Sequence, residues 1–462
     1  MATPSSAFGG LLRRYRLAAG LTQEALAERA GVSARAVGDL ERDGGRAPRL
    51  DTVALLVGAL ALPPEHEAQL RAAARPDLET AERDRPRPNG ASPLLTPPTP
   101  LIGREQEVAT ALALLRHDAH GGTPVRLLTL TGPGGVGKTR LALHLAAELR
   151  ADFPGAVQVV SLAALTEPAL VLPAIAGALG VREVSGQALL TSLAAALGEQ
   201  PALLVLDNCE QVLDAAPQLA ALLAAAPRLQ VIATSRTPLE IRGEQQFPVL
   251  PLALPAPDAV PLADQAGQSA AVRLFLDRAR AAQPGFALTT ANVAAVVAIC
   301  RRLDGLPLAL ELAAPRLQLL SPRALLARLD SRLPLLTGGA ADLPARQRTL
   351  RATLDWSHAL LAPAEQTLFA RLAVFAGGAS LAAIEAIGGD AGDAPADVLA
   401  CLEALLRASL LRRTTDDAGD VRIGMLETIR EYAAERLAVS GEEDAIRSQH
   451  AAYYLALAEA RG

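Results

Sequence analysis

A single lysine stands in a chain that otherwise uses arginine for its basic side chains. Lys138 is the one lysine among 44 lysines and arginines, and it lies in residues 132–139, GPGGVGKT. This octet matches G-x-x-x-x-G-K-[ST], in which backbone N–H groups cradle phosphates and the lysine reaches the β- and γ-phosphates. A compact ammonium fits between two phosphates, whereas a planar guanidinium is too wide. The octet therefore predicts a nucleotide-binding loop.

Two charged residues follow apolar runs downstream of this loop. Asp207 ends the run LLVLD, and Arg236 follows the run VIATS. In open parallel sheets, ligands collect at the edge formed by the carboxyl ends of the strands. We therefore predict that Lys138, Asp207 and Arg236 form the catalytic set. Thr139 and Asp207 are expected to hold Mg²⁺, and Arg236 to reach the γ-phosphate. For Arg236 taken alone, a solvated charge at a strand end is the commoner interpretation.

The residue after Asp207 bears on hydrolysis. Many P-loop ATPases carry an acid at this position that activates water, but this chain has Asn208. Glu210 is a nearby acid that could replace it. We therefore expect slow hydrolysis, in the manner of a weak ATPase that resets a switch, and no metabolic activity.

A second pattern lies near the N-terminus, in residues 20–33, GLTQEALAERAGVS. Thr22 can cap a helix, and Gly31 can supply a left-handed turn. Ser33 can cap the next helix, whose inward positions include Val37. This spacing of small and apolar residues is typical of a helix-turn-helix. Roughly residues 8–75 resemble the Cro/CI-type (Xre-like) DNA-binding domain.

In that family the second helix of the pair enters the major groove of double-stranded DNA. We expect Arg35 to contact a base, Gln23 to contact a phosphate, and Gly38 to face outward without reading a base. The candidate DNA-binding residues are Gln23, Ser33, Ala34, Arg35 and Asp39. The alternative is a small helical bundle used only for protein contact.

Composition limits the possible partners. The net charge of −5 excludes a polycation, so any DNA contact must be local. Aromatic residues make up 3% and hydrophobic residues 50% of the chain, which favours helices packed on helices. The three cysteines lie far apart without metal-ligand spacing, which is typical of buried thiols in a reducing compartment. No apolar run approaches the ~20 residues of a membrane span. We expect a cytoplasmic protein without membrane contact.

Apolar runs and proline-rich stretches predict a multidomain chain. Strands are expected at 127–131, 157–161, 203–207 and 230–234, a helix at 140–150, and a hairpin near 410–425. Strands alternating with helices indicate a parallel sheet. The predicted parts are an all-α helix-turn-helix domain (1–75), a proline-rich linker (76–100), an α/β P-loop NTPase domain with a parallel sheet (101–255), a helical domain (256–340), a winged-helix domain (341–440) and the start of a C-terminal helical, TPR-like region (441–462).

Together these motifs resemble those of a STAND-class NTPase of the NB-ARC branch. The similarity spans about residues 100–440 and rests on LIGRE at 101–105, the octet, TSR at 234–236 and GLPLAL at 305–310. The resemblance implies that the first stretch lies near the adenine, that the arginine of TSR senses the γ-phosphate and that the proline of GLPLAL packs on the adenine. The nucleotide-binding residues are then Ile102, Arg104, Gly132, Gly134, Gly135, Val136, Gly137, Lys138, Thr139, Arg140, Arg236 and Pro307.

One stretch departs from the family pattern. Residues 425–430, MLETIR, stand where many relatives carry Met-His-Asp in the winged helix. Because this stretch has no histidine, the usual contact from the winged helix to the β-phosphate is not expected from it.

We therefore expect an ATP/ADP-switched transcriptional regulator that uses Mg²⁺. ADP would hold the NTPase, helical and winged-helix domains together, and ATP would release them for self-association. Clustered helix-turn-helix domains would then bind double-stranded DNA more tightly. Two alternatives remain open: a signalling or defence scaffold whose N-terminal domain contacts protein, and an ATPase whose turnover acts on DNA. Relatives of this type continue into helical repeats, so an unknown inducer is expected to act through a C-terminal sensor not present here.

Overall fold

The chain divides into two compact units, Met1–Gly90 and Ala91–Gly462. The structure is a computed structural model. It describes residues 6–41, positions 52, 56, 57, 59, 60 and 66, and residues 99–460 except 117–123, 155–156, 182–186, 199, 257–261, 330–334, 338–347, 390–394 and 416–418. Most of the predicted linker, 76–98, lies outside the described residues.

The first unit contains the predicted helix-turn-helix. Its described helices are α1 (Ser6–Ala18), α2 (Gln23–Ala30) and α3 (Ala34–Glu41). The hydroxyl of Thr22 accepts a hydrogen bond of 3.1 Å from the Ala25 N–H, and α2 ends at Gly31 with φ 65°. Leu26 and Val37 are buried in a small apolar core. The cap and the left-handed turn are therefore where the sequence predicts them.

Gly38 corrects one expectation about the second helix of the pair. It was expected to face outward, but it is buried on α3. A glycine has no side chain, so neighbouring backbone can approach it closely. The outward face of α3 is thus narrower than the sequence suggests.

The second unit contains a sheet of five parallel strands in the order β2-β3-β4-β1-β5. The strands are β1 (Leu127–Thr131), β2 (Val157–Ser161), β3 (Ala202–Asp207), β4 (Leu229–Thr234) and β5 (Glu244–Pro248). The first four occupy the predicted runs to within one residue. The fifth, EQQFP, was missed because it is an edge strand with mostly polar, partly exposed side chains.

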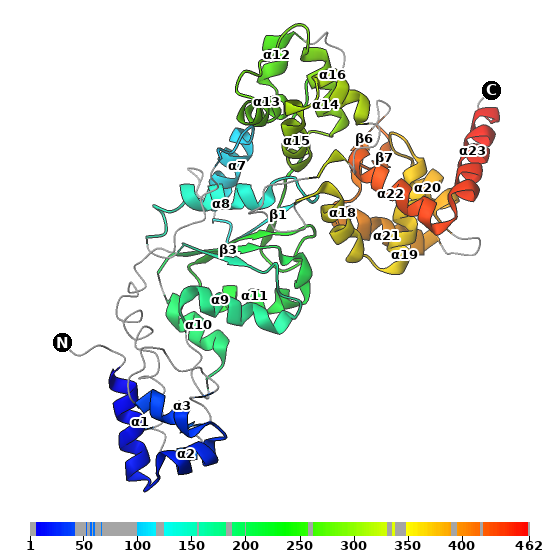
Figure 1. Cartoon of the computed structure of the whole chain (residues 1–462). Coiled ribbons are helices and arrows are strands. Elements are labelled where there is room, and N and C mark those ends of the chain that lie inside the picture. Colours follow the sequence, from blue (N-terminus) through cyan, green and yellow to red (C-terminus); the bar gives the residue numbers. More distant parts are fainter. Residues whose placement is uncertain are drawn as a thin grey trace. The chain divides into compact units, whose positions relative to one another are not determined.

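Helices cover both faces of this sheet, because the central strands are apolar at nearly every position and so present apolar side chains to both faces. Leu128 and Leu130 of β1 point into one apolar core, and Leu127 points into a second core on the opposite face of the sheet. The helices around the sheet are α7 (Glu105–Leu115), α8 (Lys138–Glu148), α9 (Val171–Leu179), α10 (Leu189–Leu197) and α11 (Ala216–Ala225), with the 3₁₀ turns η1 (Pro168–Leu170), η2 (Cys209–Gln211) and η3 (Leu213–Ala215). Figure 1 shows α9, α10 and α11 on one side of the sheet and α7 and α8 on the other.

A helical segment follows the sheet. It consists of α12 (Ala263–Gln268), α13 (Ala270–Ala282), α14 (Val293–Arg302), α15 (Pro307–Ala313), η4 (Ala314–Gln318) and α16 (Pro322–Arg328). Its apolar residues share one core with α8 and the winged helix. The short helix α15 begins at Pro307, whose fixed φ suits the first helical position.

A winged helix follows the helical segment. Its elements are α18 (Leu350–Ala359), α19 (Pro363–Arg371), η6 (Leu372–Val374), α20 (Leu381–Gly388), α21 (Pro395–Arg407), β6 (Arg412–Thr415), β7 (Val421–Gly424) and α22 (Glu427–Ser440). The antiparallel β6–β7 pair confirms the predicted hairpin. One further helix, α23 (Glu443–Glu459), lies in the region predicted to begin a helical array. No helix within the described ranges is long and apolar enough to cross a membrane.

Candidate nucleotide-binding site

The octet forms a tight loop between β1 and α8. Gly132, Gly135 and Gly137 have φ values of 148°, 79° and 99°, which residues other than glycine rarely adopt. Gly137 directly precedes α8, which begins at Lys138, two residues earlier than predicted. Backbone N–H groups that converge at a helix N-terminus form a ready anion site. The loop therefore has the geometry that phosphate binding requires.

Lys138 lies buried at the mouth of this loop. Its Nζ donates hydrogen bonds of 2.7 Å to the Gly132 carbonyl and 3.2 Å to the Pro133 carbonyl. Burial, with a smaller contribution from the nearby Arg236, lowers the pKa of Lys138 to about 8, while the acidic neighbours Glu210 and Asp207 oppose the shift. The ammonium is therefore still mostly charged near neutral pH and lies at the first residues of the loop.

Asp207 is held by hydroxyls from two other elements. Its Oδ1 accepts hydrogen bonds of 2.6 Å from Thr139 Oγ1 and 2.6 Å from Thr234 Oγ1. Thr139 is the second residue of α8, and Thr234 ends β4, which lies between β1 and β3 in the sheet. The predicted metal pair, Thr139 and Asp207, is thus brought into contact.

This pair fits Mg²⁺ when a nucleotide is present. Mg²⁺ prefers oxygen ligands and usually takes one or two carboxylates, with water and phosphate oxygens completing its shell. Across the described parts of the chain, no group of three or more His, Cys, Asp and Glu side chains could hold a metal by itself. The candidate Mg²⁺ ligands are therefore the Thr139 hydroxyl and the Asp207 carboxylate.

Arg236 is buried beside the loop, so the alternative of a solvated strand-end charge is wrong. Its Nε lies 3.3 Å from Glu210 Oε1, and the exposed fractions of the two side chains are 8% and 3%. Asn208 Nδ2 also donates to Glu210 Oε1, at 3.3 Å. The other carboxylate oxygen of Glu210, Oε2, is buried without a hydrogen-bond partner among the described residues. Glu210 therefore holds Arg236 and keeps one acceptor unused.

The stretch before α7 contacts the loop from another side. Arg104 is buried, and its Nη2 donates a hydrogen bond of 3.0 Å to the Val136 carbonyl. Its Nη1 donates to Glu107 at 2.6 Å. Ile102, two residues before Arg104, is half-buried. Arg104 thus holds the loop backbone in place, and a position of this stretch beside the adenine remains a prediction.

The start of α15 touches the loop directly. The N–H of Leu308 donates a hydrogen bond of 3.1 Å to the Gly135 carbonyl. A Cβ added to Gly135 would lie 2.8 Å from the Leu308 Cβ, so no larger residue fits there. Pro307 is half-buried at the first position of the helix. The predicted Pro307 therefore lies at the loop, and its packing on an adenine stays a prediction.

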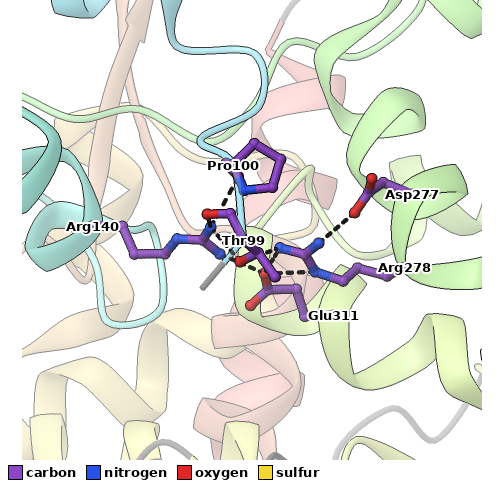
Figure 2. A network of polar contacts seen from close by, with 6 residues as sticks. All are labelled: Thr99, Pro100, Arg140, Asp277, Arg278 and Glu311. Carbon is purple, nitrogen blue, oxygen red and sulfur yellow. Dashed lines mark hydrogen bonds and ion pairs between the residues drawn. The ribbon is translucent and has the colours of Figure 1, made fainter. Parts of the chain in front are cut away.

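A polar network lies one turn further along α15 (Figure 2). Arg140 Nη1 donates to Glu311 Oε1 at 2.9 Å, and Arg278 Nη2 donates to the same oxygen at 3.0 Å. Arg140 Nη2 also donates to Thr99 Oγ1 at 2.7 Å and to the Pro100 carbonyl at 2.9 Å. The guanidinium of Arg140 thus joins α8, α15 and the segment before α7, and its predicted nucleotide contact stays a prediction.

The winged helix closes over the same region. Thr353 of α18 is 3% exposed, and a Cβ added to Gly134 would lie 2.5 Å from its Cγ2. Ser409 Oγ donates a hydrogen bond of 2.8 Å to the Arg236 carbonyl. Beside this contact lies a cleft of about 560 Å³ whose walls include Glu210, Arg236 and Ser357. Residues of the winged helix therefore meet both the loop and the arginine.

The candidate DNA-binding residues lie in the first unit. Gln23 Nε2 donates to Glu41 at 2.7 Å, and Glu41 also pairs with Arg16 at 2.6 Å. Ser33 Oγ accepts the Ala36 N–H at 3.2 Å and so caps α3. Asp39 is exposed. The side chains of Ala34 and Arg35 lie outside the described residues. Gln23 is thus tied into the domain, and contact of this set with DNA remains a prediction.

Four residues of the region escaped the sequence interpretation. Thr353 and Ser409 carry no motif, and Glu311 falls just after GLPLAL. Glu210 was considered only as a possible base and not as the partner of Arg236. Only the spacing of Glu210, three residues after Asp207, could have indicated a second carboxylate at this sheet edge.

Three domain families match parts of the chain. A helix-turn-helix family matches residues 12–66, an AAA ATPase domain family matches 100–234, and a winged helix-turn-helix domain family matches 361–438. The chain therefore combines an N-terminal helix-turn-helix, an ATPase domain built on a parallel five-stranded sheet, and a C-terminal winged helix.

Longer similarities extend over most of the chain. The "Putative HTH-type transcriptional regulator Rv0890c" of Mycobacterium tuberculosis is 44% identical over 335 residues, which cover 72% of this chain but 36% of that protein. The chain thus spans about a third of the length of that relative. The "Uncharacterized protein Rv0894" of the same organism is 36% identical over 353 residues, covering 76% of this chain and 85% of that protein. A STAND protein with a tetratricopeptide repeat sensor, PH0952 from Pyrococcus horikoshii, aligns with 77% of this chain and 45% of its own, at 16% identity and a TM-score of 0.28.

Proposed function

We propose that this chain, which belongs to the family of the Mycobacterium tuberculosis protein Rv0894, is an ATP- and ADP-binding, DNA-binding transcriptional regulator whose nucleotide state controls its assembly. The observation that carries the proposal is the convergence of Lys138, the Thr139–Asp207 pair and Arg236 around one phosphate-binding loop. A relative named as an HTH-type transcriptional regulator and the helix-turn-helix match of the first unit support the DNA-binding part.

Each group has a separate role in nucleotide binding. The loop amides and the ammonium of Lys138 neutralise phosphate charge. Thr139 and Asp207 would hold Mg²⁺, which bridges phosphate oxygens and offsets their charge. The stretch around Ile102 and Arg104, with Pro307, would flank the adenine. Binding of the nucleotide by these residues requires no movement of the sheet, because the apolar core holds the phosphate loop and β3 in place.

The closed winged helix suggests how nucleotide binding controls assembly. Thr353 of the winged helix contacts the phosphate loop, and Ser409 of the winged helix contacts Arg236. A bound nucleotide that disturbs either contact disfavours this arrangement. Full conversion between two states, from 1:99 to 99:1, requires about 5.5 kcal/mol of differential binding. ADP would keep the closed monomer, whereas ATP would release the winged helix and allow self-association.

Hydrolysis in this proposal resets the switch and is slow. The position after Asp207 holds Asn208, and Glu210 is engaged with Arg236 through Oε1. Its second oxygen can still accept a proton or orient water, so turnover is reduced rather than abolished. A rate of many ATP per second would instead favour an enzyme that uses turnover to act on DNA.

DNA binding would follow from assembly. One helix-turn-helix with one candidate base-reading arginine, Arg35, binds DNA weakly alone. Linking several copies in an oligomer raises their effective concentration at DNA, which increases affinity without new contacts. An inducer that acts on a further sensor region would set the balance between the two states.

The proposal is tested by measuring nucleotide and DNA binding on the same protein. Titration of fluorescent ADP with Mg²⁺ should show saturable binding that Lys138→Ala abolishes and the exposed Arg242→Ala leaves unchanged. Selection from a pool of random-sequence DNA duplexes should then enrich a motif with ATPγS more strongly than with ADP. Absence of enrichment in both nucleotide states would favour a scaffold whose N-terminal domain contacts protein.

A further inference from the structure

We propose that Thr353 of the winged helix is the residue that discriminates against the γ-phosphate in the closed arrangement, through its methyl group Cγ2. This inference rests on the proposed nucleotide function and assigns a residue to its specificity. Thr353 lies on α18 and faces the phosphate loop directly.

Gly134 lies opposite Thr353. Gly134 occupies a position of the octet at which the pattern accepts any residue, and it is absent from the residues with positive φ. Neither the motif nor the backbone therefore demands glycine. A Cβ at this position would lie 2.5 Å from Thr353 Cγ2, which is far too close. The contact with the winged helix is what excludes a side chain from Gly134.

Cationic side chains lie near this contact. Arg236 Nη2 lies 3.5 Å from the same Cβ position. Lys138 Nζ contacts the carbonyls of Gly132 and Pro133, the two residues just before Gly134. Since a loop lysine reaches the β- and γ-phosphates, its ammonium marks the terminal-phosphate end of the loop. Arg236 thus lies beside the Cβ position of Gly134, Lys138 lies at the two preceding residues, and the apolar methyl of Thr353 lies against Gly134.

The methyl group of Thr353 is held in a fixed position. Thr353 is 3% exposed in the first turn of α18. Its hydroxyl donates to the Thr349 carbonyl at 3.2 Å, and its own carbonyl accepts from Ser357 Oγ at 3.0 Å. A β-branched side chain in a helix has few rotamers, so Cγ2 cannot turn away easily. A further phosphate at this end of the loop requires α18 to move.

The closed protein therefore distinguishes ADP from ATP by the space that the terminal phosphate needs. A diphosphate leaves the methyl in contact with Gly134, and the winged helix stays closed. A triphosphate places charged oxygens at the end of the loop, where the methyl offers no hydrogen bond. Its binding is then coupled to displacement of α18, and this coupling lowers its apparent affinity in the closed protein.

Two substitutions separate the methyl from the hydroxyl. Thr353→Ser removes Cγ2 and keeps the hydroxyl, whereas Thr353→Val keeps a methyl and removes the hydroxyl. Thr349→Ser is the matched control, because it makes the same change at the N-cap of α18 and preserves the hydroxyl that accepts a hydrogen bond of 2.9 Å from the Ala352 N–H. Each variant is titrated with fluorescent ADP and, in competition, with ATPγS, both with Mg²⁺.

We expect Thr353→Ser to raise ATPγS affinity relative to ADP by about tenfold, the order expected when one crowded methyl is removed. Thr353→Val and Thr349→Ser should keep the wild-type ratio. An unchanged ratio in Thr353→Ser would overturn the proposal while the nucleotide function stands. A ratio that changes in Thr353→Val and not in Thr353→Ser would overturn it too, because the hydroxyl would then be the determinant. Failure of the wild-type protein to bind either nucleotide would instead reject the nucleotide function itself.

Discussion

Asp304, in the turn before α15, accepts a hydrogen bond of 2.8 Å at Oδ2 from the backbone N–H of Thr428 in the first turn of α22. The acceptor belongs to the helical segment and the donor to the winged helix. Thr428 is fully buried. Burial raises the pKa of Asp304, although the N–H groups at the start of α22 oppose this shift. A carboxylate from one part of the chain thus caps a helix of another.

The first prediction concerns this inter-domain cap. Asp304→Ala should leave a buried N–H without its acceptor and weaken the closed arrangement by about 1–3 kcal/mol. Asp304→Asn keeps an oxygen acceptor and removes the desolvated charge, so it should behave close to wild type. Hydrogen exchange of amides in the first turn of α22, and the release rate of fluorescent ADP, should both increase in the alanine variant. Equal exchange in all three proteins would show that the cap does not hold the winged helix.

The second prediction follows from the pKa of Lys138, which burial lowers to about 8. Phosphates favour the charged amine, so the pKa rises when nucleotide binds. Affinity is then fully present below the free pKa and is lost as pH rises through it, by up to about tenfold per pH unit. Calorimetry of ADP binding between pH 7.5 and 9.5, in buffers of different ionisation enthalpy, should detect proton uptake at the high end. A constant affinity across this range would mean that the lysine stays charged in the free protein.

The third prediction concerns the buried pair of Arg236 and Glu210. Removing one partner of a buried ion pair leaves an uncompensated charge and typically destabilises by about 3–5 kcal/mol. Glu210→Ala should therefore lower stability to urea more than Arg236→Ala/Glu210→Ala does. Exposed Glu105, paired with Arg273, offers a control, because Glu105→Ala should have a small effect. Similar losses for the buried and exposed glutamates would contradict the role of Glu210 as the partner that holds the arginine.

The fourth prediction concerns the network around Glu311 (Figure 2). Glu311→Gln removes the charge that two guanidiniums share, while its size is unchanged. Because the side chains are 14–28% exposed, we expect a loss of only about 1 kcal/mol. The local effect should be larger: amides of residues 99–104 should exchange faster, since Arg140 also holds Thr99 and Pro100. Unchanged exchange in this segment would show that Glu311 is not needed to anchor it.

Local sequence patterns predicted the elements that such patterns determine. Four strands, the phosphate loop, the Thr139–Asp207 contact and the helix-turn-helix cap follow from apolar runs, glycine positions and capping residues. The edge strand Glu244–Pro248 was missed because an edge strand need not be apolar. The contacts made by Thr353, Ser409 and Asp304 join segments far apart in the sequence. No local pattern encodes which surfaces of two domains meet, so these contacts required the fold.

Control of assembly by the bound nucleotide is the central proposed property of this protein. Size-exclusion chromatography with light scattering measures this on the purified protein with Mg²⁺ and ADP, with Mg²⁺ and ATPγS, and without nucleotide. We predict a monomer with ADP, a larger mass with ATPγS, and no nucleotide dependence in Lys138→Ala. The same mass in ADP and ATPγS, measured while both are bound at saturation, would contradict the account.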